Sequence, residues 1–409
     1  MRILHTADWH LGQRLCDQDR KEEHDLFLRW LLDALKEHQP DALLVAGDVF
    51  DVGYPAKYAE TQYYDFLKEA YRLCPNIIIV GGNHDSPNAL NAPRKLLTSF
   101  NIHVIGGAFA DIEEEIIQIK DSNGNLMGIV AAIPFLREGD VRTLQSGENY
   151  QDKITAYKQG IKQHYRELCN AVLPFKQQGY PIIATGHLYA AGSSVSDTED
   201  KDMHIIGHQG QMEVEIFPPE FDYIALGHIH KPQMVNGKQH IRYSGSPIPL
   251  NFSERNDNKQ VLLVEFEQHR GLTNIESLPV PLYRHLNRFK GNFDSVTQQL
   301  QQFQHTSVLQ SCWAEIHLLL ETYEFNFEEP IKQLAKDKNI DILKFPNPKF
   351  LTNPTEQVAD EPADMDLLQN CTSVFLEKCK ANKVADEHLP ELEYTFNELM
   401  DLMSMEEGN

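Results

Sequence analysis

Five short polar segments of the chain carry side chains that bind metal ions, and each one follows an apolar stretch. In chain order they are Asp8-Trp9-His10, Gly47-Asp48-Val49-Phe50-Asp51, Gly82-Asn83-His84-Asp85, Gly186-His187 and Gly227-His228-Ile229-His230. Together they offer carboxylates, imidazoles and one amide oxygen, without a thiolate. This donor set suits Mn²⁺, iron or Zn²⁺ in a reactive centre and argues against a structural zinc site.

The order and spacing of these segments are more specific than any one of them. In Asp-x-His and His-x-His, both side chains lie on the same side of an extended chain, so a pair can hold one ion or serve two adjacent ions. The neighbouring glycines allow sharp turns and close approach of the backbone. The other histidines that we considered are interpreted as surface or satisfied core residues: His5, His24, His38, His103 and His164.

The elements that position these segments alternate between strands and helices. Strands are predicted at residues 2–7, 42–46 and 77–80, with amphipathic helices around residues 27–35 and 59–70 between them. This β-α-β-α-β order predicts parallel strands with right-handed crossovers. Further strands are predicted at 128–133, 182–185, 223–226 and 261–265. Because ligands bind at the carboxyl ends of strands in α/β sheets, the five segments are expected to converge.

Three more regions follow the predicted domain at residues 1–280. Prolines near residue 280 mark a break, and residues 281–345 again alternate between strands and helices, which predicts a small α/β unit. Residues 346–363 form a proline-containing linker. Residues 364–409 contain two amphipathic helices, with apolar faces formed by Leu368, Cys371, Phe375 and Cys379, and by Leu392, Phe396, Leu399, Met400 and Met403. These helices either dock on the body of the protein or bind a partner; the linker favours a partner.

The composition excludes several classes of protein. The chain has 409 residues and a formal net charge of −23, which is unlike a single basic nucleic-acid-binding module. Residues 355–409 hold 14 acidic and 3 basic residues, so much of the negative charge lies in the tail. The apolar stretches are too short for a membrane helix or a signal peptide. The 6 cysteines are scattered and are expected to be reduced thiols, which predicts a cytoplasmic protein.

The five segments resemble the calcineurin-like metallophosphoesterases, whose pattern is D-x-H, G-D-x-x-D, G-N-H-[DE], a lone H and G-H-x-H. The resemblance covers at least residues 1–253. Residues 3–12, 45–51, 132–136 and 243–250 resemble more narrowly the SbcD family, the nuclease subunits of bacterial SbcCD complexes, which are related to double-strand-break-repair nucleases. The implied fold is an α/β sandwich of β-sheets flanked by helices, with a small α/β capping domain and a C-terminal helix pair.

The resemblance also implies a role for each polar residue. Asp8, His10 and His230 would hold one ion, Asn83, His187 and His228 the other, and Asp48 would bridge them. His84 would act beside the scissile phosphate, and Asp51 would orient His84 through its ring N–H. Two divalent ions, with Mn²⁺ favoured, would lie about 3.5–4 Å apart, neutralise the phosphate and activate the attacking water.

The function implied is that of a DNA nuclease subunit with double-strand 3′–5′ exonuclease and single-strand or hairpin endonuclease activity, in DNA repair, recombination and replication. Its partners would be DNA, an SMC-like coiled-coil ATPase of the SbcC type bound through the C-terminal helices, and a second copy within a heterotetramer. Arg14, Arg20 and Lys21 are candidate phosphate contacts. Two alternatives are a metallophosphatase or phosphodiesterase acting on nucleotides or phosphoproteins, and a non-catalytic protein that retains the fold.

Overall fold

The computed structural model describes residues 1–142, 150–193, 211–320, 327–346, 349–350, 375–376, 378–380, 384–385 and 388–406. The chain divides into two compact units, Met1–Arg284 and His285–Asn409. Among the described residues, no helix combines the length and the apolar character needed to cross a membrane.

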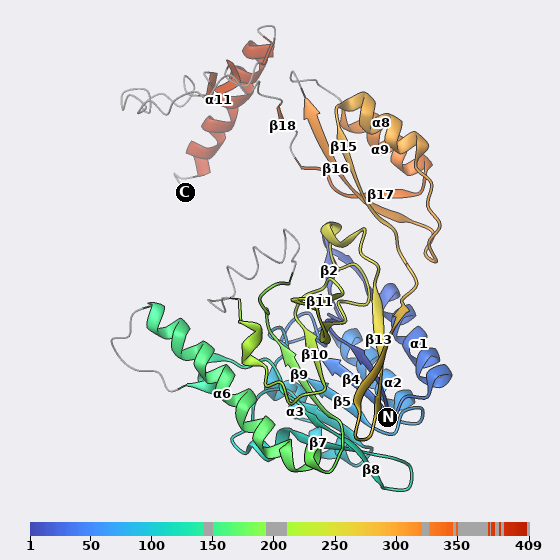
Figure 1. Cartoon of the computed structure of the whole chain (residues 1–409). Coiled ribbons are helices and arrows are strands. Elements are labelled where there is room, and N and C mark those ends of the chain that lie inside the picture. Colours follow the sequence, from blue (N-terminus) through green and yellow to red (C-terminus); the bar gives the residue numbers. More distant parts are fainter. Residues whose placement is uncertain are drawn as a thin grey trace. The chain divides into compact units, whose positions relative to one another are not determined.

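The first sheet of the N-terminal unit has the strand order β14-β13-β1-β4-β5-β6 (Figure 1). Its parallel strands are β1 (Arg2–Thr6), β4 (Ala42–Ala46), β5 (Ile77–Val80) and β6 (Ile102–Ile105). On the other edge, β13 (Gln260–Glu267) pairs antiparallel with β1 and with β14 (Gly271–Pro279). The parallel order β1-β4-β5 confirms the β-α-β-α-β prediction.

The second sheet has the order β11-β12-β10-β9-β8-β7. Its central strands, all parallel, are β12 (Lys238–Tyr243), β10 (Tyr223–Gly227), β9 (Ile182–His187) and β8 (Leu126–Ala131). The edges are antiparallel and are formed by β11 (Gln233–Val235) and β7 (Ile116–Lys120).

The two sheets pack face to face around a shared apolar core. Alternate residues of each strand point into this core, because successive side chains of a strand face opposite sides of the sheet. The residues between the sheets include Ile3, Leu44, Ile78, Val130, Ile183 and Ala225. Their neighbours along the same strands, such as Leu43 and Ile79, pack instead toward the helices. This arrangement confirms the predicted sandwich of β-sheets.

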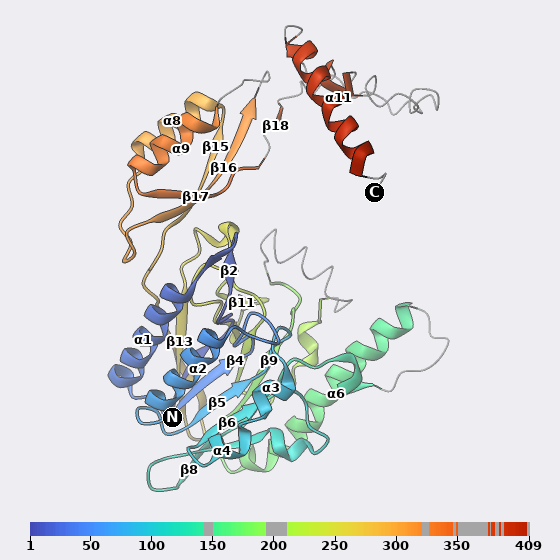
Figure 2. The same cartoon turned by 180° about the vertical axis from the view of Figure 1, so that it is seen from behind.

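Helices cover both outer faces of the sandwich (Figures 1 and 2). α1 (Lys21–His38) and α2 (Lys57–Ala70) pack on the first sheet, whereas α6 (Tyr150–Gln177) packs on the second. The shorter elements of this unit are the β2 (Arg14–Leu15) and β3 (Gln18–Asp19) hairpin, α3 (Pro87–Asn91), α4 (Arg94–Thr98), α5 (Glu138–Val141) and the 3₁₀ helices η1 (Ile112–Glu115), η2 (Val214–Ile216) and η3 (Phe252–Glu254).

The second unit begins with the predicted alternation of strands and helices. Its parallel strands are β15 (Leu286–Gly291), β16 (Cys312–Leu320) and β17 (Ile340–Lys344), and β18 (Lys349–Phe350) also pairs with β16. Two helices, α8 (Phe293–Gln302) and α9 (Glu328–Asp337), share a core with this sheet, which includes Phe289, Leu300, Ile316 and Ile331.

The chain ends with α11 (Leu389–Glu406), at the position of the second predicted terminal helix. The ring of Phe396 on α11 stacks on the ring of Phe375, with a centroid distance of 4.2 Å and an interplanar angle of 6°. The two apolar faces predicted from the sequence therefore contact each other at this point. Leu368, Cys371 and most of the predicted linker at residues 346–363 lie outside the described residues.

Candidate metal centre

The five polar segments meet at the carboxyl ends of strands from both sheets. Asp8, Asp48 and Asn83 follow β1, β4 and β5 of the first sheet. His187 ends β9 and His228 follows β10 of the second sheet. The centre is therefore built between the ends of two packed sheets, which hold its ligands in one place.

The central residue of each paired motif anchors the pair in the core. Trp9 and Ile229 are completely buried, whereas the ligands on either side of them point to the centre. The extended backbone that we expected for these pairs was wrong, since φ is 54° at Asp8, 47° at His10 and 95° at His228. Left-handed backbone of this kind costs about 1–3 kcal/mol per residue and persists where the surrounding structure enforces it.

Two glycines beside the ligands are required by close approach of the backbone. A Cβ atom at Gly227 would lie 1.9 Å from the carbonyl oxygen of Ala46, and one at Gly82 would lie 2.1 Å from Oδ1 of Asp48. Any side chain at either position would displace a strand end that carries a ligand. Glycine is thus needed at these two positions because it lacks a side chain, which allows the close approach predicted for these motifs.

Asp48 lies at the middle of the cluster. Its Oδ2 atom is 3.1 Å from Nε2 of His187 and 3.4 Å from Nε2 of His10. Its Oδ1 atom accepts a hydrogen bond of 2.9 Å from the backbone N–H of His84. The carboxylate is therefore in contact with residues from both proposed ligand sets.

Asn83, His187 and His228 form one side of the cluster. Oδ1 of Asn83 lies 3.0 Å from Nε2 of His187 and 2.9 Å from Nδ1 of His228. On its other side, the His187 ring donates from Nδ1 to the carbonyl oxygen of Ala46 at 2.9 Å. That bond leaves Nε2 as the basic nitrogen of the neutral ring, directed at Asn83 and Asp48.

Asp8, His10 and His230 form the other side. The rings of His10 and His230 meet edge to face with a centroid distance of 5.1 Å. Oδ1 of Asp8 accepts a 2.8 Å hydrogen bond from the backbone N–H of His228, which links this side to the first. The structure thus brings all the predicted ligands together.

Unpartnered buried atoms show that the residues present fit metal ions. Within the described part of the chain, Oδ2 of Asp8 and Nε2 of His10 are buried and have no hydrogen-bond partner. Leaving such an atom unsatisfied costs about 1–3 kcal/mol. Potential ligand atoms of His10, Asp48 and His84 lie within 4.8 Å of one another, as do those of Asp48, His187 and His228. Asp48 belongs to both groups of potential ligands.

Burial and neighbouring charges set the pKa values of the cluster, and a histidine nitrogen can bind a metal ion only after it has lost its proton. Burial lowers the pKa of His228 to about 3, and the neighbouring His187 adds to this effect, so its ring is neutral. Burial also disfavours the charged form of His187, but the Asp48 carboxylate outweighs it and raises the pKa of His187 to about 9. In turn, although burial opposes it, His187 holds the pKa of Asp48 well below its usual range.

Asp51 contacts His84, but through its backbone. Nδ1 of His84 donates to the main-chain oxygen of Asp51 at 2.7 Å, whereas the Asp51 carboxylate lies 3.1 Å from Nδ1 of His10. Asp51 thus contacts the ring N–H of His84 as expected, but through its carbonyl, whereas its side chain contacts His10. The half-buried His84 ring lies next to the ring of His10, with a centroid distance of 4.8 Å.

Asp85 ends the Gly-Asn-His-Asp motif, yet the sequence assigned it no role. Its buried carboxylate accepts hydrogen bonds from the backbone N–H groups of Val49 at 3.1 Å, Phe50 at 2.9 Å and Gly82 at 2.9 Å. It thereby ties the loop after β4 to the loop after β5, and these two loops carry Asp48 and Asn83. In the sequence, the position of Asp85 directly after His84 was the feature that could have pointed to a role in the centre.

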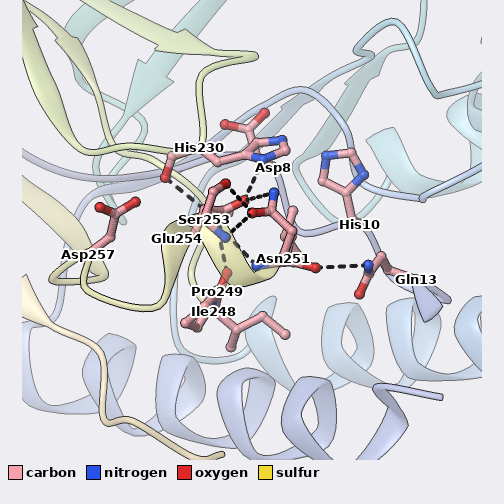
Figure 3. Close-up of polar contacts among 12 residues, drawn as sticks. Asp8, His10, Gln13, His230, Ile248, Pro249, Asn251, Ser253, Glu254 and Asp257 are labelled. Atoms are coloured by element: carbon pink, nitrogen blue, oxygen red, sulfur yellow. Dashed lines mark hydrogen bonds and ion pairs between the residues drawn. The ribbon is translucent and has the colours of Figure 1, made fainter. Parts of the chain in front are cut away.

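Glu254 was missed altogether. This buried residue in η3 lies 24 residues after His230 and accepts a 3.0 Å hydrogen bond from Nδ1 of its ring (Figure 3). Nothing in the surrounding Asn-Phe-Ser-Glu sequence distinguishes this glutamate from a surface residue. Only the fold brings it next to the metal centre.

The three candidate phosphate contacts differ in exposure. Arg14 and Lys21 are exposed, with about half of each side chain accessible to solvent (56% and 50%). Arg20 is completely buried; its Nε lies 2.7 Å from a Glu23 carboxylate oxygen, and its Nη1 donates to the Pro249 carbonyl at 2.9 Å. The prediction that Arg20 contacts DNA was therefore wrong, since this guanidinium stabilises the interior.

Comparison with protein families places the whole centre inside one known type of domain. Residues 1–232 match the model of the calcineurin-like phosphoesterases, and this range contains every predicted ligand. Residues 282–378 match a second model, described as the type 5 capsule protein repressor C-terminal domain.

Several curated proteins are similar to most of the chain. The SbcD subunit of the SbcCD nuclease from Escherichia coli strain K12 is 39% identical over 347 residues, which are 84% of each chain. The SbcD protein from Rhodobacter capsulatus is 35% identical over 69% of this chain and 71% of its own. The SbcD protein from Bacillus subtilis is 34% identical over 65% of this chain and 66% of its own. A solved dimetal phosphatase from Danio rerio aligns with a TM-score of 0.35 and 11% identity, over 68% of this chain and 98% of its own.

Proposed function

The chain belongs to the calcineurin-like phosphoesterases and, within them, to the SbcD family, and on that basis we propose that it is a metal-dependent DNA nuclease subunit. The shared name of relatives that cover most of the chain supports this function over a phosphatase acting on nucleotides or phosphoproteins. The complete ligand set argues against a non-catalytic protein.

The observation that carries the proposal is the convergence of both ligand sets on Asp48. Its carboxylate contacts His187 from the second sheet and His10 from the first. In the proposed site, Asp8, His10 and His230 hold one divalent ion, Asn83, His187 and His228 hold the other, and Asp48 bridges them. We propose Mn²⁺ for these ions, one of the metals that mixed carboxylate, amide and imidazole donors suit.

The residues of the chain have distinct tasks in phosphodiester hydrolysis. The ions, when bound, offset the charge of the phosphate and favour deprotonation of the attacking water. His84 donates from Nδ1 to the Asp51 carbonyl, so its Nε2 is the ring nitrogen that can carry a second proton. We assign that proton to the leaving oxygen as the P–O bond breaks. The half-exposed position of His84, at the rim of a buried ligand cluster, supports this role.

The proposed substrate is DNA, with double-strand 3′–5′ exonuclease and single-strand or hairpin endonuclease activity in repair, recombination and replication. Arg14 on the β2–β3 hairpin and Lys21 at the start of α1 are the remaining candidate phosphate contacts. Both already have acidic neighbours, Asp19 and Asp25, so the nuclease chain alone is expected to bind DNA weakly.

We further propose an SMC-like coiled-coil ATPase of the SbcC type as partner and a homodimer of this chain within a heterotetramer. The relatives are named as subunits of a complex, which supports a partner of this kind. The stacked pair of Phe375 and Phe396 supports the terminal helices as one binding module. The acidic residues of these helices suit contact with a protein surface better than contact with DNA. In this scheme, residues 1–280 form the nuclease domain, residues 281–345 form the capping domain, and residues 346–363 link the capping domain to the helices.

A digestion assay tests the proposed function. The chain is combined with its ATPase partner, ATP and Mn²⁺, and is given linear double-stranded DNA, p-nitrophenyl phosphate or nucleotides. We expect degradation of the DNA, and none with Asp48→Asn in the same complex. Turnover of p-nitrophenyl phosphate or nucleotides alone would show that the enzyme is a phosphatase instead.

A further inference from the structure

The ring of His230 is held by a group outside the five motifs. Its Nδ1 donates to Oε1 of Glu254 at 3.0 Å, and Glu254 is 1% exposed. An imidazole that donates from Nδ1 has its basic lone pair on Nε2 when the ring is neutral. The contact therefore determines which ring nitrogen of His230 can bind an ion.

The carboxylate of Glu254 is itself fixed by several donors. Oε1 also accepts from Nδ2 of Asn251 at 2.8 Å, and Oε2 accepts from the backbone N–H of Leu250 at 3.1 Å and from Oγ of Ser246 at 3.1 Å. In Figure 3 the contacts gather around Glu254. A buried carboxylate whose oxygens are occupied in this way is not available as a metal ligand, so its effect on an ion acts through His230.

Lys259 completes the arrangement. Its buried ammonium lies 2.6 Å from Oε2 of Glu254 and donates to the main-chain oxygen of His230 at 3.0 Å. Burial favours the neutral acid, but Lys259 and His230 together outweigh burial and lower the pKa of Glu254 below its usual range. His230 is thus held at its ring by Glu254 and at its backbone by Lys259.

The loop that carries these groups is anchored to the nuclease body. Nε2 of Gln13 donates to the Leu250 carbonyl at 3.1 Å, and the buried Arg20 donates to the Pro249 carbonyl at 2.9 Å. The segment directly before η3, and with it Glu254, is therefore held against the residues that follow β1 and precede α1.

We propose that Glu254, together with Lys259, is a positioning residue that holds His230 with its proton on Nδ1 and so strengthens one of the two metal sites. This inference rests on the proposed role of His230 as a ligand. A carboxylate partner orients a ligating histidine and raises its basicity, and losing such a partner costs about 10–100-fold in metal affinity.

The test uses the full chain and Mn²⁺ alone, with three variants. His230→Ala should lose one of two ions in a calorimetric titration. Glu254→Gln keeps the size of the side chain but removes the charge, and it should weaken the same ion about 10–100-fold while the other ion binds as in the wild type. Asp222→Asn is the matched control, because Asp222 also pairs with a lysine, Lys176, and caps a strand through the Ile182 N–H, at the opposite end of the second sheet. It should leave both affinities unchanged.

A second readout needs no metal. Long-range ¹H–¹⁵N spectra of the metal-free chain should show His230 with its proton on Nδ1, and a mixture of tautomers in Glu254→Gln. If Glu254→Gln does not fold, Glu254→Asp keeps the charge next to Lys259 but withdraws it from His230, and should show the same two effects.

The outcomes separate the inference from the proposed function. If His230→Ala loses an ion but the Glu254 variants bind both ions normally with an unchanged tautomer, the positioning role is wrong and the metal centre stands. If His230→Ala itself binds both ions like the wild type, His230 is not a ligand, and both the inference and the ligand set behind the proposed function are overturned.

Discussion

The carboxylate of Asp51 lies 3.1 Å from Nδ1 of His10, so the last residue of the Gly-Asp-x-x-Asp motif orients a ligand of the motif before it. Asp51→Ala should therefore weaken the ion at His10 by about 10–100-fold. His84 should keep its place, because it bonds the carbonyl of Asp51, which any residue provides. Mn²⁺ titration of the variant, beside the surface control Asp17→Ala, measures this; equal affinities in both would contradict the assignment.

Substitution of His84 separates catalysis from metal binding. His84→Ala should reduce DNA cleavage by at least about 100-fold, the range expected for loss of a general acid. Both ions should remain, because Asp48 still contacts His10 and His187. Metal analysis of the purified variant accompanies the cleavage assay. Loss of an ion would make His84 a ligand rather than the acid.

Metal binding should depend on pH through His187. Without metal, Asp48 overcomes the effect of burial and raises the pKa of His187 to about 9, so Nε2 must lose a proton before it binds an ion. Affinity should therefore rise with pH toward about 9, and metal binding at neutral pH should release protons. Calorimetry in two buffers with different ionisation enthalpies measures this release. Heats that do not depend on the buffer would contradict it.

The basic residues near the first motif should divide into two kinds. Arg20→Met should lower the free energy of unfolding by about 1–3 kcal/mol, because Glu23 and the Pro249 carbonyl lose a buried donor while Glu23 keeps its pair with Arg284. Arg14→Ala should leave stability unchanged and, if Arg14 contacts a phosphate, lower the salt slope of DNA affinity by about one unit. Urea unfolding and DNA titrations at several salt concentrations test both. A stable Arg20→Met with weakened DNA binding would reverse the assignment.

The sequence predicted the strands and the polar segments at their ends because both follow local rules. β4 and β5 are runs of apolar residues that end at polar motifs, and their parallel pairing follows from the helices between them. The antiparallel pairing of β13 with β1 was less accessible locally, since the two strands lie more than 250 residues apart in the chain.

The supporting residues of the site needed the fold. Glu254 and Lys259 have no motif, and their role depends on a loop placed by Gln13 and Arg20. Arg20 itself looked like a surface cation, because its burial depends on Glu23 one helical turn later and on the distant Pro249. The contact between the Asp51 carboxylate and the His10 ring also needed the fold, because it accompanies a left-handed backbone at His10.

The central claim is that the five strand-end segments hold two divalent ions bridged by Asp48. Anomalous scattering from a crystal of the chain grown with Mn²⁺ measures this most directly. We predict two peaks, one next to Asp8, His10 and His230 and the other next to Asn83, His187 and His228, with Asp48 in contact with both. A single peak, or two peaks of which only one contacts Asp48, would contradict the account.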